Sequence, residues 1–214
     1  MKRLNYTLLS DGSTDQALLP ILTWSLRANH VTCAVQPAWA DLRRLPRPPL
    51  QLAARLVQAV ALYPCDLLFV HRDAERASLE DRIDEIRVAF REASLQGQMP
   101  RHICVVPVRM QEAWLLFDEA AIRWAAGNPN GKQILQLPAL AQLEQLPDPK
   151  EMLYDLLREA SGLEGRRRRR LELSASAVRV SDFIEDYAPL RTLPAFQALQ
   201  LGVQEAVQNE GWQA

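Results

Sequence analysis

The sequence predicts an α/β fold in which a mainly parallel, Rossmann-like sheet carries helices on both faces and is followed by a helical C-terminal subdomain. Over the first half of the chain, strand-like and helix-like segments alternate, which favours parallel strands joined by right-handed crossovers. The run Leu67–Val70 is apolar throughout, as in strands covered on both faces. The last third has no strand pattern. We therefore expect an α/β domain over residues 1–126 and a helical extension over residues 127–214 packed on it.

Four strands are expected at residues 4–9, 31–35, 67–70 and 103–108. Apolar residues at helical spacing place helices between them, for example Leu18, Leu22 and Leu26 after the first strand. Ser78 and Asp81 resemble a capping box for the helix after the third strand. The proline-rich segment 37–49 predicts a long loop.

The second half of the sequence reads as helical from Gln111 onward, interrupted by turn residues at 127–131. Asp148 followed by Pro149 and, three residues after the cap, Glu151 predicts a helix start, and Gly162 predicts its end. Further helical stretches are expected at residues 173–187 and 194–208.

The amino-acid composition limits the kinds of protein to which this chain can belong. The chain has 214 residues and 48% of them are hydrophobic, enough to bury a sizeable core. The formal net charge of −1 gives no overall attraction to nucleic acid, so any such contact must come from a local patch. The three cysteines lack CxxC spacing and predict reduced thiols and a cytoplasmic location. Neither a signal peptide nor a membrane-spanning segment is expected.

Acidic residues follow two of the predicted strands. Asp11 follows the first strand and Asp73 the third, and these strands are neighbours where the winding of such a sheet reverses. Two carboxylates there make a site for Mg²⁺ or Mn²⁺, which prefer oxygen ligands and can activate water against a phosphodiester. A second metal, proton transfer or support for the ligands could involve Asp15, Glu75, Glu112 and His71.

Three of these acidic and histidine positions also have a purely structural interpretation. Asp73 could cap the following helix, His71 could be a hydrogen-bonded residue at a strand end, and Glu112 could favour a helix dipole. The expected nucleic-acid contacts are basic: Arg43, Arg44, Arg47, Lys150, Arg166, Arg167 and Arg168. Arginines at these places are also typical of solvated loops and interface patches.

Three segments carry a family resemblance: Leu9–Asp15, Val70–Asp73 and Val106–Asp118. In this order they resemble the TOPRIM-like bacterial domains of unknown function, distant relatives of the nuclease half of overcoming-lysogenization-defect enzymes. The resemblance implies a metal-dependent nuclease or phosphodiesterase, a hydrolase acting in phage defence with an ATPase partner. Homo-oligomerisation stays open.

Two departures from the TOPRIM pattern concern the metal site. TOPRIM enzymes usually have Glu where this chain has Asp11, and their Asp-x-Asp pair is here His71-Arg72-Asp73. Losing a carboxylate weakens Mg²⁺ binding, and His favours softer metals. The alternative function is a catalytically degenerate binding or regulatory subunit. A nucleotide-modifying Rossmann enzyme is disfavoured because no glycine-rich phosphate loop follows the first strand.

Overall fold

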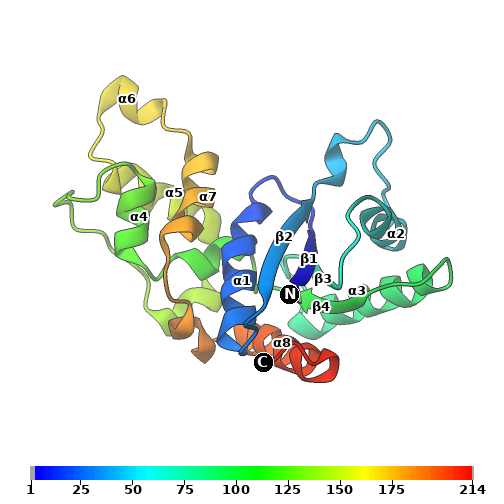
Figure 1. Cartoon of the computed structure of the whole chain (residues 1–214). Coiled ribbons are helices and arrows are strands. Elements are labelled where there is room, and N and C mark those ends of the chain that lie inside the picture. Colours follow the sequence, from blue (N-terminus) through cyan, green and yellow to red (C-terminus); the bar gives the residue numbers. More distant parts are fainter. Residues whose placement is uncertain (1–2, 214) are drawn as a thin grey trace.

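A four-stranded, all-parallel sheet forms the centre of the computed structural model, which describes residues 3–213. The strand order is β2-β1-β3-β4 (Figure 1). The strands are β1 (Arg3–Leu9), β2 (Ala34–Ala40), β3 (Leu67–His71) and β4 (Arg101–Val105). The predicted α/β class with a Rossmann-like parallel sheet is confirmed, as is the pairing of the first strand with the third.

Helices and loops connect the strands and form the C-terminal part of the chain. The α-helices are α1 (Leu18–Ala28), α2 (Leu52–Leu62), α3 (Leu79–Ser94), α4 (Glu119–Ala125), α5 (Pro149–Ala160), α6 (Gly165–Arg169), α7 (Leu173–Phe183) and α8 (Pro194–Glu210). Short 3₁₀ helices are η1 (Asp15–Ala17), η2 (Leu42–Arg44), η3 (Gln111–Leu115), η4 (Leu140–Gln145) and η5 (Ala188–Thr192).

The sheet buries both of its faces. Along β3, Leu67 and Phe69 join a core shared with α1, α8 and the other C-terminal helices. The alternate residues, Leu68 and Val70, join a second core formed with α2 and α3. Because successive side chains of a strand point to opposite faces, an unbroken apolar run requires cover on both sides.

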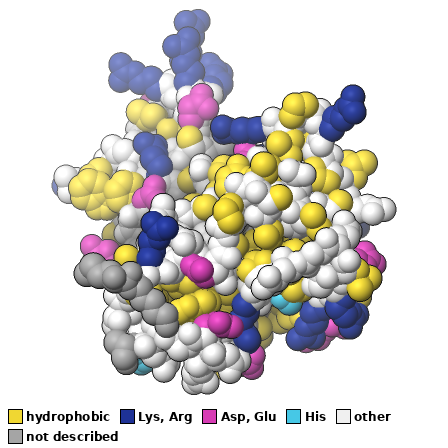
Figure 2. All heavy atoms as spheres, turned by 45° about the vertical axis from the view of Figure 1, so that its right-hand side comes forward, with side chains coloured by type: hydrophobic (Ala, Val, Ile, Leu, Met, Phe, Trp, Pro, Cys, Tyr) yellow, Lys and Arg dark blue, Asp and Glu magenta, His cyan; other side chains and the backbone are white. Residues whose placement is uncertain are grey.

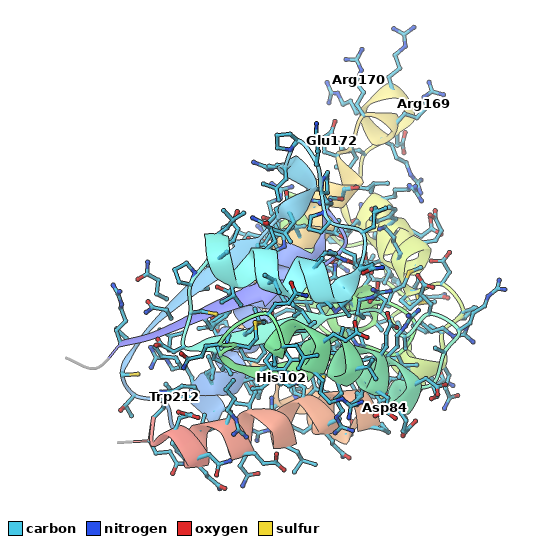
Figure 3. The ribbon with its side chains drawn as sticks, turned by 90° about the vertical axis from the view of Figure 1, so that its right-hand side faces the viewer. Asp84, His102, Arg169, Arg170, Glu172 and Trp212 are labelled. Atoms are coloured by element: carbon cyan, nitrogen blue, oxygen red, sulfur yellow. The ribbon has the colours of Figure 1, made fainter. Side chains whose placement is uncertain are left out.

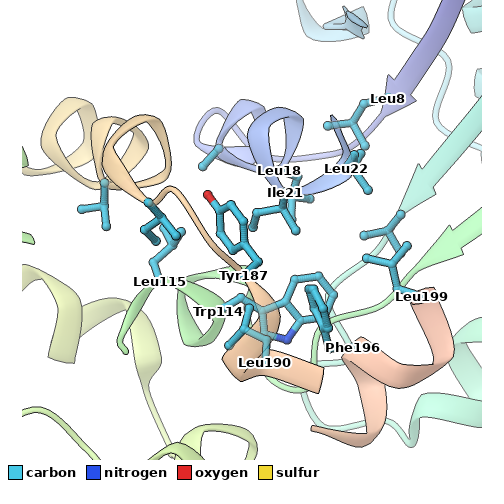
Figure 4. Packing of buried hydrophobic residues seen from close by; sticks show 14 of the residues in the cluster. Leu8, Leu18, Ile21, Leu22, Trp114, Leu115, Tyr187, Leu190, Phe196 and Leu199 are labelled. Atoms are coloured by element: carbon cyan, nitrogen blue, oxygen red, sulfur yellow. The ribbon is translucent and has the colours of Figure 1, made fainter. Parts of the chain in front are cut away.

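The C-terminal helices belong to the same core as the sheet. Trp114 lies at its centre, fully buried, and packs edge-on against Phe196 of α8 with ring centroids 5.2 Å apart (Figure 4). Tyr187 and Leu190 are buried beside them. Residues after 126 therefore contribute to the packing that covers one face of the sheet.

Two predicted helix starts have the expected capping. The Ser78 Oγ accepts a hydrogen bond from the Asp81 N–H at 3.0 Å, and the Asp81 side chain reaches back to the Ser78 N–H. At α5, Asp148 Oδ1 accepts from the Glu151 N–H at 2.9 Å and Pro149 stands in the first turn. Side-chain acceptors here satisfy N–H groups that have no partner within the helix.

The predicted second strand was misplaced. It runs from Ala34 to Ala40, and residues 37–40 of the predicted loop belong to it. Pro37 is tolerated because β2 is an edge strand that pairs only with β1 in the described part of the chain. The predicted continuous helix from Gln111 is also wrong: η3 ends at Leu115, and Asp118 caps a separate helix, α4.

Within residues 3–213, no helix is both long enough and apolar enough to cross a bilayer.

Candidate active site at the carboxyl ends of the strands

A cavity of about 300 Å³ opens where β1 and β3 end. Leu9 pairs with Val70, β2 lies beyond β1 and β4 lies beyond β3, so the winding of the sheet reverses at this point. Ligands of open α/β sheets bind in the crevice at such a switch point. The loops after β1, β3 and β4 line the cavity, and Lys150 from α5 completes it.

Five carboxylates line the cavity, and three of them, Asp15, Asp73 and Glu112, lie farther in than Asp11 and Glu75. Asp15 and Glu112 are 4% and 3% exposed, whereas the Asp73 side chain is 29% exposed. Buried carboxylates need hydrogen bonds or cations to balance the loss of water. This concentration of buried negative charge is the main chemical feature of the site.

Gln111 connects the acidic residues to one another. Its Nε2 donates to Asp15 Oδ1 at 3.1 Å and to the Thr14 hydroxyl at 3.2 Å, and its backbone N–H donates to Asp73 Oδ1 at 3.0 Å. Thr14 in turn donates to Glu112 Oε1 at 3.5 Å. No pattern in the sequence identifies Gln111 or Thr14 as site residues, because their partners belong to other segments, most of them about one hundred positions away.

His71 presents its Nε2 to two of the acids. The ring Nδ1 lies 3.0 Å from the Val105 carbonyl oxygen, and a carbonyl only accepts, so Nδ1 carries the hydrogen. Nε2 then lies 3.5 Å from Asp73 Oδ1 and 3.8 Å from Asp15 Oδ2. Fixing one imidazole nitrogen on a backbone carbonyl is the arrangement that orients histidine for metal binding or proton transfer at the other nitrogen.

The pKa of Asp73 is raised from 3.8 to about 6, mainly by burial. The His71 ring opposes this rise, while the charges of Asp15 and Glu112 add to it. A carboxyl group that ionises near neutrality, beside other acids in a cavity, is typical of functional sites.

The raised pKa of Asp73 predicts a pH-dependent stability. The folded protein holds a proton that the unfolded chain releases, so this contribution is complete below about pH 4 and is lost as the pH rises through 6. Relative to Asp73→Asn, the wild type should lose up to about 3 kcal/mol of unfolding free energy between pH 4 and pH 7. Urea unfolding of both proteins in the presence of EDTA measures this difference. A free energy of unfolding that changes with pH in the same way in both proteins would contradict the prediction.

Asp11 lies at the rim of the cavity, apart from Asp15, Asp73 and Glu112. Its carboxylate is bound by Arg55 and by Arg72, whose Nε is 3.1 Å from Oδ2, and its side chain is 44% exposed. Arg55 also donates to the Ser10 carbonyl at 2.7 Å. We expected Asp11 to be the cation ligand beside Asp73, whereas the acid that the structure places with Asp73 at His71 Nε2 is Asp15.

The turn itself brings Asp15 inward. The Gly12 N–H donates to Asp15 Oδ2 at 2.6 Å, and a Cβ at residue 12 would overlap the Asp15 carboxylate. Glycine is therefore needed for the close approach of backbone and carboxylate. The other acid proposed as a ligand, Glu75, stands at the rim with its side chain 67% exposed and 3.6 Å from Arg82.

Of the predicted basic contacts, only Lys150 lies in the cavity. Its Nζ is 3.5 Å from Glu112 Oε1. Burial disfavours the ammonium, but Glu112 and the other anionic neighbours outweigh burial and raise the pKa of Lys150. Arg43 and Arg44 of η2 pair with the preceding Asp41, at 2.7 and 3.1 Å. The structure places Arg166, Arg167 and Arg168 in the exposed helix α6.

The donor set suits a hard divalent cation but does not form a complete cage. In the described part of the chain, no three His, Cys, Asp or Glu side chains are arranged to hold a metal ion. Mg²⁺ is commonly held by only one or two carboxylates, with waters and substrate phosphates as the remaining ligands. Asp15 and Asp73 are the residues that would hold it, with His71 Nε2 beside them.

Fold and site together define an α/β protein with an acidic, histidine-containing cavity at the switch point of a parallel sheet. Comparisons with family models, with curated proteins and with solved structures find no match to the chain. The TOPRIM-like assignment therefore stays a prediction from sequence motifs.

Proposed function

We propose that this protein is a divalent-cation-dependent nuclease, a phosphodiester hydrolase that acts on a polynucleotide. The observation that carries the proposal is the convergence of Asp15, Asp73 and Glu112 on one open cavity, in which His71 Nε2 lies within 3.8 Å of both Asp15 and Asp73. Such a concentration of carboxylates is unfavourable unless a cation offsets it. No other cavity described in the structure combines these groups.

The residues support a division of roles. Asp15 and Asp73 would hold Mg²⁺ or Mn²⁺, and the bound cation would offset the charge that develops on the phosphodiester. His71 Nε2 faces Asp15 and Asp73 and can take a proton from the attacking water when it carries none. Lys150 can hold a phosphate oxygen of the substrate as a point charge. Gln111 and Thr14 would keep the carboxylates oriented.

Two basic protrusions support a polymeric substrate. Helix α6 and the loop after β2, which contains Arg43, Arg44 and Arg47, both rise on the side of the molecule where the strands end (Figures 1 and 3). Figure 2 shows Lys and Arg side chains gathered on a protrusion at the top. The cavity lies at the base of these protrusions, so a nucleic-acid backbone lying across this side would meet both of them.

The length of α5 suggests the size of substrate that could reach both the cavity and α6. Helix α5 begins beside the cavity at Lys150, and its 12 residues span about 18 Å before the chain turns into α6. At about 3.4 Å per nucleotide, this distance corresponds to about five nucleotides. A mononucleotide in the cavity would not reach α6, whereas an oligonucleotide would.

The arginines of α6 are available for phosphate. Arg169 and Arg170 project outward from the tip (Figure 3), and Arg166–Arg170 form no ion pair with any residue between 3 and 213. Changing Arg166, Arg167 and Arg168 together to Gln is expected to lower the slope of log affinity against log salt by about 2 to 3. Fluorescence anisotropy with a labelled 20-mer measures the slope.

Two comparisons control the α6 measurement. Arg91→Gln removes an exposed arginine from α3, outside both protrusions, and should leave the slope unchanged. A trinucleotide should bind the wild type and the triple variant equally, because it is too short to reach α6. An unchanged slope for the 20-mer in the triple variant would exclude α6 from the binding surface.

Calorimetry with Mn²⁺ and Mg²⁺, followed by cleavage assays on plasmid DNA and single-stranded RNA, tests the proposed activity. Asp15→Asn should lose both cation binding and cleavage. Asp155→Asn makes the same chemical change on the exposed side of α5 and should lose neither. Nucleic-acid binding without cation binding or cleavage in the wild type would instead support the regulatory alternative.

A phage-defence role with an ATPase partner rests on the family resemblance alone, and co-purification of the protein with its partners tests it.

A further inference from the structure

The side-chain oxygen of Gln111 has no hydrogen-bond partner, although the residue lines the cavity and is 2% exposed. Two other buried side-chain atoms between residues 3 and 213 share this property, and both are nitrogens, Trp114 Nε1 and Arg123 Nη1. Buried polar atoms nearly always have a partner. A buried acceptor without one, on a residue of the cavity wall, therefore indicates a group that binds there.

The neighbours of the Gln111 amide fix which of its two ends is the oxygen. A carboxylate only accepts hydrogen bonds, so the end that lies 3.1 Å from Asp15 Oδ1 is the nitrogen. The same nitrogen donates to the Thr14 hydroxyl at 3.2 Å, and this hydroxyl donates its own hydrogen to Glu112 Oε1. Turning the amide over would set two acceptor oxygens against each other. The atom without a partner is therefore the amide oxygen, Oε1.

The donor groups of Gln111 bind the two carboxylates that are proposed to hold the cation. Its Nε2 donates to Asp15, and its backbone N–H donates to Asp73 Oδ1 at 3.0 Å. Thr14 and Asp15, the partners of the side-chain amide, both line the cavity, so the amide belongs to the cavity wall. Two carboxylates bound to one residue make the local potential negative, which favours a cation over a neutral donor as the partner of Oε1.

We infer that Gln111 Oε1 is a third oxygen ligand of the divalent cation, beside the carboxylates of Asp15 and Asp73. The inference rests on the proposed function, because it assigns a ligand to the cation that the proposed activity needs. Carboxylate and carbonyl oxygens suit Mg²⁺ and Mn²⁺, whereas imidazole suits Zn²⁺. A third oxygen therefore makes the site selective for a hard cation in spite of the His71 ring.

Two substitutions separate the oxygen of Gln111 from its nitrogen. Gln111→Met and Gln111→Glu both remove the Nε2 donor, but only Gln111→Glu keeps an oxygen on the side chain. We expect Gln111→Met to weaken Mn²⁺ binding by at least about tenfold in calorimetry, and Gln111→Glu to bind Mn²⁺ at least as tightly as the wild type. If Gln111 only positioned Asp15 through Nε2, the two variants would weaken binding equally.

The number of waters on the bound ion is a readout that a positioning role would not change. Electron paramagnetic resonance of bound Mn²⁺, in water labelled with a magnetic oxygen isotope, counts these waters. Gln111→Met should carry an additional water in place of the lost oxygen, and Gln111→Glu should match the wild type. Circular dichroism checks the fold, and Gln111→Leu, which also lacks the oxygen, replaces Gln111→Met if that variant does not fold.

Gln200 supplies a matched control in α8. It is half-buried, and its Nε2 donates to Ser25 Oγ at 2.7 Å. Gln200→Met makes the same chemical change at a residue that does not line the cavity, and it should alter neither the affinity for Mn²⁺ nor the number of waters on the ion.

The outcomes distinguish this inference from the proposed function. Equal affinity and equal water number in the wild type and Gln111→Met, with cation binding lost in Asp15→Asn, would overturn the inference and leave the proposed function standing. Equal losses in Gln111→Met and Gln111→Glu would also overturn it, since Gln111 would then act only by positioning Asp15. A wild type that binds neither Mn²⁺ nor Mg²⁺ would overturn both.

Discussion

Asp73→Asn is expected to abolish divalent-cation binding and to reduce phosphodiester cleavage by at least about a hundredfold. The substitution keeps the shape of the side chain and its contact with the Gln111 N–H, but it removes the negative charge that faces His71 Nε2. A lost cation ligand and a lost catalytic charge each have effects of this size or larger. Calorimetric titration with Mn²⁺ and initial cleavage rates measure both effects.

Asp11→Asn tests which of the two acids that follow β1, Asp11 or Asp15, is the cation ligand. Asp11 is held by Arg55 and Arg72 at the rim, so its loss should reduce cleavage less than about tenfold, whereas Asp15→Asn should match Asp73→Asn. If Asp11→Asn proved as damaging as Asp73→Asn, the ligand assignment would return to Asp11. Cleavage that survives Asp73→Asn would place the activity outside this cavity.

Trp114→Ala is expected to lower the free energy of unfolding by about 3 to 5 kcal/mol, because it leaves a large cavity where the sheet and the C-terminal helices meet. Trp114 is fully buried and packs edge-on against Phe196. Denaturant unfolding, monitored by far-UV circular dichroism, measures the loss.

Two further tryptophan variants control for the change of residue type. Trp114→Phe keeps most of the apolar volume and removes an indole N–H that has no hydrogen-bond partner in the described structure, so it should cost less than Trp114→Ala. Trp124 is 55% exposed and stacks on Phe183, and Trp124→Ala should cost about 1 kcal/mol or less. Equal losses for Trp114→Ala and Trp124→Ala would contradict the central position of Trp114 in the core.

Sequence patterns predicted correctly those strands and helix caps that depend only on residues close together in the chain. The apolar run at Leu67–Val70 and the capping residues Ser78 and Asp148 behave as expected because each depends on neighbours within a few positions. The second strand was misplaced because Pro37 signals a loop, and only the edge position of β2 removes that conflict.

The arrangement of the site depends on contacts that sequence spacing does not encode. Arg55 binds Asp11 across 44 positions, and Gln111 binds Asp15 across 96. These two long-range contacts set Asp11 at the rim and Asp15 inside the cavity. Motif spacing placed acids at the correct strand ends, but it could not tell which of two acids in one turn points inward.

Because Lys150 follows the acidic residues in the chain, the cavity is complete only when the segment that carries Lys150 is in place. The acidic residues 15, 73 and 112 precede in the chain the residue that supplies the cationic wall, and α5, which carries that residue, packs in the core that the sheet shares with the later helices. A nascent chain that has not yet folded its C-terminal helices thus has the carboxylates without Lys150. The complete cavity is a property of the finished chain.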